Sequence, residues 1–250
     1  MLYARKISNL IIEAMKSLCP TKVAISFSGG LDSSVLAKAA RDMGFDVLLI
    51  TVGMENSSDI KNSIIVAKDL GLPHEKVCPT YAEVISAYSL CQKIMPGEFL
   101  KVELMVPVYF ACKKAKEKNF SHIIFGSGSE ELFVGYDRYF TYLKEGVDLE
   151  RILQEEIRYL PYGDCKRIDA TANYFNLITI YPFLYSPLIE FVLSLPLSQR
   201  IGTKENKKPL LRESAMLLGV PDSARMRPKK AMQYGSGIHR ILLKEFGKKN

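Results

Sequence analysis

The stretch SFSGGLDSS, which runs from Ser26 to Ser34, is the most informative segment of this sequence. It follows an apolar run that is typical of a buried strand, and it precedes a helical pattern that begins at Val35. Two glycines allow the backbone to approach a bound anion closely, and the amides that open a helix point toward such an anion. The sequence therefore predicts a phosphate-binding loop between a strand and a helix.

This loop carries Asp32 and lacks the lysine of the common phosphate loop G-x-x-x-x-G-K-[ST]. A carboxylate beside phosphates is explained by Mg²⁺, which binds carboxylate and phosphate oxygens together. Backbone amides and the hydroxyls of Ser28, Ser33 and Ser34 would then bind a pyrophosphate unit, which favours cleavage of a nucleotide to AMP and pyrophosphate. Taken alone, the segment also fits an ordinary capped turn.

Strand-like and helix-like segments alternate up to about Tyr139. Strands are expected at 22–27, 45–52, 75–78 and 121–128, and helices at 35–44, 58–71, 81–93 and 106–120. This order predicts an α/β fold with a doubly wound parallel sheet, whose ligands lie at the carboxyl ends of the strands. The phosphate-binding loop and a second glycine-rich turn, GSGSEE from Gly126, both fall at such ends.

After about Gly146 the strand signal fades, and helices are expected at 149–160, 185–195 and 208–218. We expect one domain over residues 1–250. Within it, residues 1–145 would form the nucleotide-binding α/β core, and residues 146–250 a mostly helical part that binds substrate and phosphates. Residues 1–20 are typical of an amphipathic helix, whose apolar stretches are too short for a signal peptide. The apolar window 176–196 is interrupted by Pro182, Pro187 and Glu190, so no membrane span is expected.

The chain has 250 residues and a net charge of +7, which is concentrated near its end. Residues 200–250 contain 13 Lys and Arg against 4 Asp and Glu. Such a segment suits phosphate-rich ligands, either nucleotides or nucleic acids. The five cysteines form no CxxC pair, which favours buried free thiols and a cytoplasmic location. The three histidines show no metal-ligand spacing, and no zinc site is expected.

Three further segments accompany the phosphate loop. GSGSEELFVGY runs from Gly126 to Tyr136, and Pro182-Phe183-Leu184 is followed by an apolar helix and Leu195-Pro196. The third consists of KPLLR, which begins at Lys208, together with RPK, which begins at Arg227 and precedes Gly235 and Gly237. In this order, the four segments resemble the synthetase domain of glutamine-dependent asparagine synthetases, which are ATP pyrophosphatases with a PP-loop. The resemblance extends from Ser26 to Gly237.

The resemblance implies an adenine-nucleotide α-hydrolase-like fold that binds ATP and Mg²⁺. It implies that Asp32 and Glu130 bind Mg²⁺. It also implies that Lys229 neutralises the charge that develops in the transition state, or that Lys230 does so if the alignment is shifted by one residue. Lys208 either adds positive charge near the phosphates or is a solvated residue at the start of a helix. Tyr136 and Tyr139 are expected to be core or lining residues. The implied nucleotide-binding residues are Ser26, Ser28, Gly29, Gly30, Asp32, Ser33, Ser34, Val52, Gly53, Gly126 and Arg227.

Two departures concern the acceptor and the acyl substrate. Ser127 stands where asparagine synthetases carry the glutamate that is assigned to deprotonating ammonia. Ile178 and Ile180 replace the E-x-R that precedes PFLD, and Tyr185 replaces its aspartate. The glutaminase half of the family is also absent from this sequence, which implies free ammonia, an amine or a separate glutaminase subunit as the nitrogen source.

The sequence therefore predicts an ATP-dependent, AMP-forming ligase that joins a small-molecule carboxylate to ammonia or an amine. The departures leave open which carboxylate it uses and whether the protein forms homo-oligomers. A tRNA-modifying enzyme with the same loop is one alternative, although the second and fourth segments favour the ligase over nucleic acid binding. A non-catalytic nucleotide-binding relative is the other, and pyrophosphate exchange would separate it from the ligase.

Overall fold

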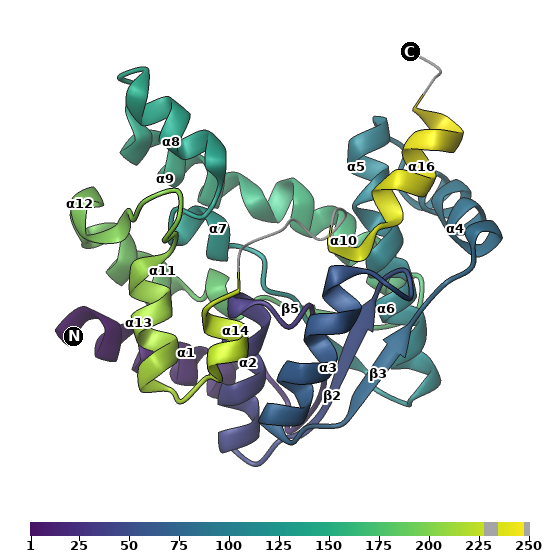
Figure 1. The fold of residues 1–250 in the computed structure, drawn as a ribbon, viewed down its shortest axis with the longest axis horizontal. Coiled ribbons are helices and arrows are strands. Elements are labelled where there is room, and N and C mark those ends of the chain that lie inside the picture. Colours follow the sequence, from purple (N-terminus) through teal and green to yellow (C-terminus); the bar gives the residue numbers. More distant parts are fainter. Residues whose placement is uncertain (228–234, 248–250) are drawn as a thin grey trace.

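A computed structural model describes residues 1–227 and 235–247 of the chain. Five short strands form one parallel sheet, and helices cover both of its faces (Figure 1). This architecture confirms the predicted α/β class. The strands are β1 Lys22–Ser26, β2 Asp46–Val52, β3 His74–Val77, β4 His122–Ile124 and β5 Ile178–Ile180.

Helices make up most of the described chain. Before β4 they are α1 Leu2–Leu18, α2 Leu31–Asp42, α3 Ser58–Leu70, α4 Tyr81–Ile94, α5 Phe99–Glu103 and α6 Met105–Glu117. Between β4 and β5 they are α7 Ser129–Leu132, α8 Asp137–Lys144, α9 Leu149–Tyr159, the 3-10 helix η1 Leu160–Tyr162 and α10 Asp164–Asn173. After β5 they are the 3-10 helix η2 Pro182–Leu184, α11 Ser186–Ser194, α12 Leu197–Arg200, α13 Pro209–Leu217, α14 Asp222–Arg225 and α16 Ile238–Phe246.

The strand order β3-β2-β1-β4-β5 places the two glycine-rich loops side by side. From β1 the chain proceeds outward through β2 and β3, and it then returns to the other side of β1 to form β4 and β5. Strand order therefore reverses between β1 and β4. In open α/β sheets, ligands bind at such a reversal, just beyond the carboxyl ends of the strands. The loops that follow β1 and β4 flank that point.

Alternating strand residues supply two hydrophobic cores, one on each face of the sheet. Val23 and Ile25 of β1 pack with α1, α2, α11 and α13 on one face. Ala24, between them in sequence, packs on the other face with α4, α6 and α16. Because successive strand side chains point to opposite faces, a fully buried strand must be apolar throughout. This requirement explains why residues 23–25 and 47–50 read as continuous apolar runs.

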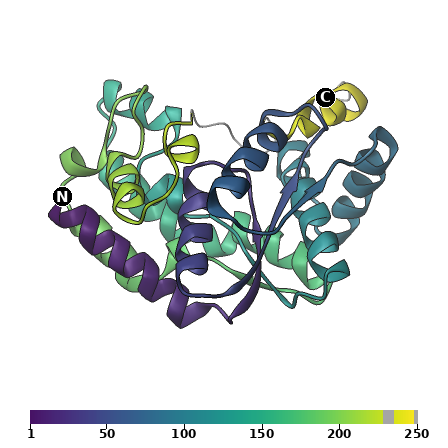
Figure 2. The same ribbon diagram turned by 60° about the horizontal axis from the view of Figure 1, so that its bottom comes forward.

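The N-terminal helix α1 packs against helices from the far end of the chain. Figure 2 shows α1, coloured purple, along the outer edge of the molecule. Its buried residues contact α11 and α13. Ser8 Oγ donates to the carbonyl of Ser214 at 3.2 Å, and Ser214 Oγ donates to the carbonyl of Ala4 at 3.0 Å. The two ends of the sequence thus stabilise one face of the sheet together.

The structure corrects the sequence analysis in the second part of the chain. The sequence pattern predicts no strand after Gly146, but β5 pairs with β4 in parallel and forms an edge of the sheet. With only three residues, β5 is too short to show a strand period. The helices α8, α10 and α16 were also not expected. Among the described residues, no helix is both long and apolar enough to cross a membrane.

All five cysteines are free thiols, as expected. The expectation that they are buried is right for Cys91, Cys112 and Cys165, whereas Cys78 is exposed and Cys19 is partly exposed. Cys78 follows β3, which is the other edge strand of the sheet, and this position explains its exposure.

Candidate active site

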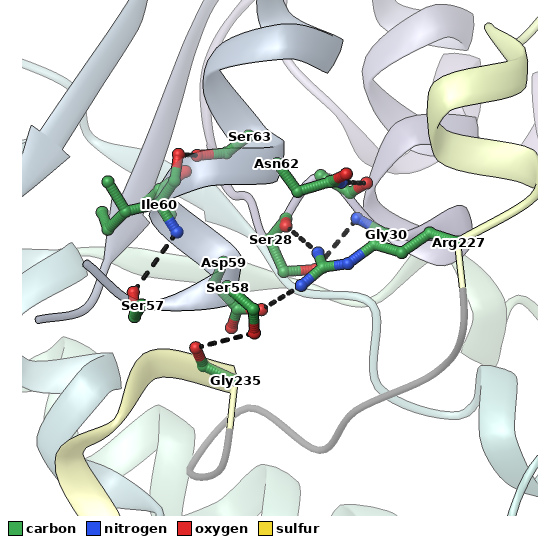
Figure 3. Close-up of polar contacts among 12 residues, drawn as sticks. Ser28, Gly30, Ser57, Ser58, Asp59, Ile60, Asn62, Ser63, Arg227 and Gly235 are labelled. Atoms are coloured by element: carbon green, nitrogen blue, oxygen red, sulfur yellow. Dashed lines mark hydrogen bonds and ion pairs between the residues drawn. The ribbon is translucent and has the colours of Figure 1, made fainter. Parts of the chain in front are cut away.

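The loop after β1 packs closely against the start of α3. Gly29 has a φ of +66°, and a Cβ at this position would lie 2.8 Å from Ser63 Cα. Asn62 Nδ2 donates to the Gly29 carbonyl at 2.5 Å, and Arg227 donates to the Ser28 carbonyl at 2.5 Å (Figure 3). Only glycine meets both the backbone and the space requirements at position 29.

Helix α2 begins directly after Gly30, so its first amides face the end of the sheet. The first amides of a helix have no partner within the helix and carry the positive end of its dipole. Ser33 Oγ lies 3.4 Å from Ser28 Oγ, and the Ser28 amide donates to Ser33 Oγ at 3.3 Å. Ser34 Oγ is buried and has no hydrogen-bond partner among the described residues. The loop therefore presents amides and hydroxyls, which are anion-binding groups.

Two carboxylates meet at the ammonium group of Lys208. Lys208 Nζ lies 2.8 Å from each oxygen of Asp32, 2.6 Å from Glu130 Oε1 and 3.1 Å from Ser129 Oγ. Asp32 belongs to α2, Glu130 to α7, and Lys208 precedes α13. Lys208 is only 4% exposed, so it is not a solvated residue. Three elements that are distant in sequence thus share one buried cation position.

Local backbone geometry allows this close approach. Lys208 has a φ of 56°, an uncommon value for a non-glycine residue, at the N-terminal boundary of α13. A Cβ on Gly135 would collide with both the Glu130 carboxylate and the Lys208 side chain. The glycine of the ELFVGY segment is therefore required by side-chain packing around the ion pair.

One cavity of about 420 Å³ connects the phosphate loop with the region around α7 and α10. This volume is in the range of small-molecule binding sites. Near the sheet, the cavity is lined by Ser26, Ser28, Asp32, Ser33, Val52, Gly126, Ser127 and Glu130. Another part of its wall, which we call the outer wall, is formed by Leu104, Met105, Pro107, Val108, Glu131, Tyr136, Arg138, Leu160, Asp164, Arg167 and Ile168.

The outer wall combines an apolar surface with a few charged groups. Burial raises the pKa of Glu131 to about 7, and the neighbouring Glu130 adds to this shift. Arg138 pairs with Glu156 at 2.8 Å and stacks on the ring of Tyr136. Arg167 Nη1 is buried and has no hydrogen-bond partner among the described residues. The outer wall thus contains a carboxyl group that titrates near neutral pH and a guanidinium that can accept an anionic partner.

The structure brings most of the sequence-predicted site residues together. Ser26 ends β1, residues 27–30 form the loop, and Asp32, Ser33 and Ser34 belong to the first turn of α2. Gly126 and Glu130 follow β4 and line the same cavity. Val52 lines the cavity, whereas the Gly53 amide donates to the Val77 carbonyl at 3.0 Å. Lys229 and Lys230, the residues expected to contact transition-state charge, lie outside the described residues.

Sequence reasoning did not identify the residues that hold the site together. Asp59 and Asn62 occur in a segment that shows only a helical pattern, and Arg167 in one where no element was expected. The apolar residues around them determine the helical pattern of the sequence. Whether a polar side chain points toward the site depends on tertiary packing, which this pattern does not show. Ile178, which replaces the glutamate of the E-x-R that precedes PFLD in the family, is 59% exposed and does not line the cavity.

The chain matches one protein family over nearly its whole length. The profile of the asparagine synthase family matches residues 7–148 and 141–248. A putative glutamine-hydrolyzing asparagine synthetase 1 of Methanocaldococcus jannaschii is 28% identical over 276 aligned residues, which cover 96% of this chain and 50% of that protein. The glutamine-hydrolyzing asparagine synthetase of Gallus gallus is 32% identical over 228 residues, covering 86% and 40%. The chain thus spans half the length, or less, of these curated relatives.

A solved structure supports the fold assignment independently. The NMN synthetase of Francisella tularensis superposes with a TM-score of 0.51 at 15% sequence identity. The match covers 99% of this chain and 86% of that one. At this level of identity, the similarity concerns the fold alone.

Proposed function

Since the chain belongs to the asparagine synthase family, we propose that it is an ATP-dependent ligase that activates a carboxylate as its adenylate and transfers the acyl group to ammonia or an amine. One observation carries this proposal. The amide-presenting phosphate loop and the Asp32–Lys208–Glu130 cluster face the same cavity as the mixed apolar and charged outer wall. Nucleotide phosphates and an acyl substrate would thus lie side by side.

In the first step, a substrate carboxylate oxygen attacks the α-phosphorus of ATP. The bond between the α-phosphorus and the bridging oxygen breaks, and pyrophosphate leaves. The amides at the start of α2 and the hydroxyls of Ser28 and Ser33 would bind this leaving group. Its position is set by the loop, whose close packing on α3 allows little displacement.

Mg²⁺ suits the donor set of this site. Asp32 and Glu130 already converge on one cation, the Lys208 ammonium, which shows that their oxygens can share a positive charge. Asp32 and Glu130 would hold Mg²⁺, which when bound neutralises phosphate charge. Among the described residues, no cluster of three or more His, Cys, Asp and Glu side chains is arranged for a metal. Water and nucleotide phosphate oxygens would supply the remaining ligands.

In the second step, the amine attacks the acyl carbon, AMP leaves, and the amine loses a proton. Ser127 is a poor base, although it lines the cavity. Glu131 is better suited to accept the proton, because a base with a pKa of about 7 is matched to neutral pH. We assign the proton transfer to Glu131 and an anionic group of the acyl substrate to Arg167, both of which line the outer wall.

The decisive experiment is ATP–pyrophosphate exchange, measured with Mg²⁺ against a panel of carboxylates. A carboxylate that supports exchange is expected, and Asp32→Asn should abolish its exchange while the protein remains folded. Asp42→Asn, a change on the exposed end of the same helix, is the matched control and should retain exchange. A folded Asp32→Asn protein with normal exchange would contradict the assignment, and wild-type protein that binds ATP without any exchange would indicate a nucleotide-binding relative without catalysis.

The basic C-terminal segment is the one observation that favours an RNA-modifying enzyme. Several of its cations have structural partners, which weakens that reading. Arg200 is 1% exposed and pairs with Glu150, and Lys208 pairs with Asp32 and Glu130. RNA binding with a steep dependence on salt concentration would nevertheless support this alternative.

A further inference from the structure

Three consecutive carbonyl groups at the phosphate loop are each bound by a side chain from another element. Thr51 Oγ1 of β2 donates to the Phe27 carbonyl at 2.6 Å. Arg227 Nη1, which follows α14, donates to the Ser28 carbonyl at 2.5 Å. Asn62 Nδ2 of α3 donates to the Gly29 carbonyl at 2.5 Å. Figure 3 shows Asn62 on α3 and Arg227, on the chain that follows α14, both directed at the loop.

These contacts have a direct consequence for anion binding. A carbonyl oxygen carries partial negative charge, so a loop that binds phosphates must direct its carbonyls away from the anion and its amides toward it. A carbonyl that is turned into the protein interior requires a donor, because an unsatisfied buried acceptor costs about 1–3 kcal/mol. The side chains of Thr51, Arg227 and Asn62 supply those donors.

The donors are themselves held in place. Asp59 Oδ1 binds Arg227 Nη2 at 2.6 Å, and the Asp59 side chain is 5% exposed. Thr51 Oγ1 also lies 2.8 Å from His74 Nε2. A Cβ on Gly235 would collide with the Asp59 carboxylate, and Ser58 Oγ donates to the Gly235 carbonyl at 3.3 Å (Figure 3). Asp59 is thus confined between Arg227 and the backbone of Gly235.

We propose that Thr51, Asn62 and Arg227 form a carbonyl brace, a set of positioning residues that keeps the phosphate loop in its pyrophosphate-binding conformation before the ligand arrives. Asp59 aims Arg227 at the loop. None of these four residues needs to contact the ligand, because each acts through a loop carbonyl or through another member of the brace. This inference rests on the proposed nucleotide function and adds the mechanism by which the loop is preorganised.

The test uses the two uncharged members of the brace. Thr51→Val is nearly isosteric and removes the donor to Phe27, and Asn62→Ala removes the donor to Gly29. Because neither residue carries a charge, a loss of phosphate affinity cannot come from a lost positive charge. Inorganic pyrophosphate and ATP are titrated calorimetrically into the full chain in buffer with Mg²⁺, and adenosine binding is measured by displacement of ATP.

Each variant is expected to bind pyrophosphate about tenfold more weakly, as for the loss of one net hydrogen bond in the loop, and adenosine with nearly unchanged affinity. Asn9→Ala, on the exposed face of α1, is the matched control and should bind both ligands as the wild type does.

Normal pyrophosphate affinity in both variants would overturn the brace alone. An equal loss of pyrophosphate and adenosine affinity would also overturn it, since it would indicate general damage to the fold. Wild-type protein that binds neither ATP nor pyrophosphate would overturn the nucleotide site, and the brace with it.

Discussion

Glu131 is a cavity residue whose charge state near neutral pH depends on burial. Its pKa is raised from 4.5 to about 7, mainly because burial disfavours the charged carboxylate. Between these pH values, the folded protein binds more protons than the unfolded chain. The free energy of unfolding therefore falls as the pH rises through this window, and the full penalty is present above pH 7.

Glu131→Gln removes this penalty. We expect the variant to gain up to about 3 kcal/mol of stability over the wild type at pH 8, and little at pH 4, because 1.36 kcal/mol corresponds to one pKa unit. Urea unfolding at both pH values measures the difference. Glu145→Gln, at an exposed site, is the control. A gain of equal size at both pH values would show that burial does not shift the pKa of Glu131.

Lys229 and its neighbour Lys230 provide a second prediction at this scale. If Lys229 meets charge that develops only in the transition state, Lys229→Ala should lower kcat by about 10²–10³ while ATP affinity changes little. Lys230→Ala should cost less than about tenfold, as for a solvated neighbour. The measurement is kcat and ATP Kd for both variants. The opposite ranking would move the catalytic role to Lys230, and two mild effects would remove it from this segment.

At the scale of elements, Lys208 joins α2, α7 and α13 through one ammonium group. Lys208→Met would remove the buried ammonium group that lies within 2.8 Å of both the Asp32 and the Glu130 carboxylates. We expect a loss of about 3–5 kcal/mol in the free energy of unfolding, as for other buried ion pairs that lose one partner. Urea unfolding at neutral pH measures this loss.

Lys207→Met tests the same helix start without the buried pair. Lys207 binds Asp137, which is 76% exposed, so this ion pair should contribute less than about 1 kcal/mol. If both variants lose the same stability, the buried cluster has no special role in holding the three elements together.

At the scale of the whole molecule, the two parts of the chain complete each other. Helix α1 of the first part packs on α11 and α13 of the second, and β5 pairs with β4. We therefore expect the full chain to unfold in one cooperative transition, with coincident circular dichroism and tyrosine fluorescence curves. A fragment of residues 1–145 should not fold alone, because it would expose the apolar faces of α1 and the sheet. A fragment with a native-like cooperative transition would show that the core is an independent domain.

The sequence by itself determined the order of most elements and the position of the phosphate loop. Apolar runs such as Val23–Ile25 and the glycines of SGGLDSS can be recognised in the sequence, because few residue types suit a strand that is buried on both faces or a backbone that is approached closely. The same local logic predicted that Asp32 and Glu130 follow the carboxyl ends of two strands, whereas the adjacency of those strands comes from the order of the sheet.

Only the tertiary structure decided which side chains support that loop. In the sequence, Lys208 looks like a solvated residue at the start of a helix, and Asn62 looks like an ordinary polar residue of a helix. Lys208 has its role because the fold brings it to the carboxylates of Asp32 and Glu130. Asn62 has its role because α3 packs against the Gly29 carbonyl. The three-residue strand β5 likewise exists because β4 offers it a hydrogen-bonding edge. Local patterns reflect the nearest neighbours in sequence, whereas polar partners and short strands depend on contacts across the fold.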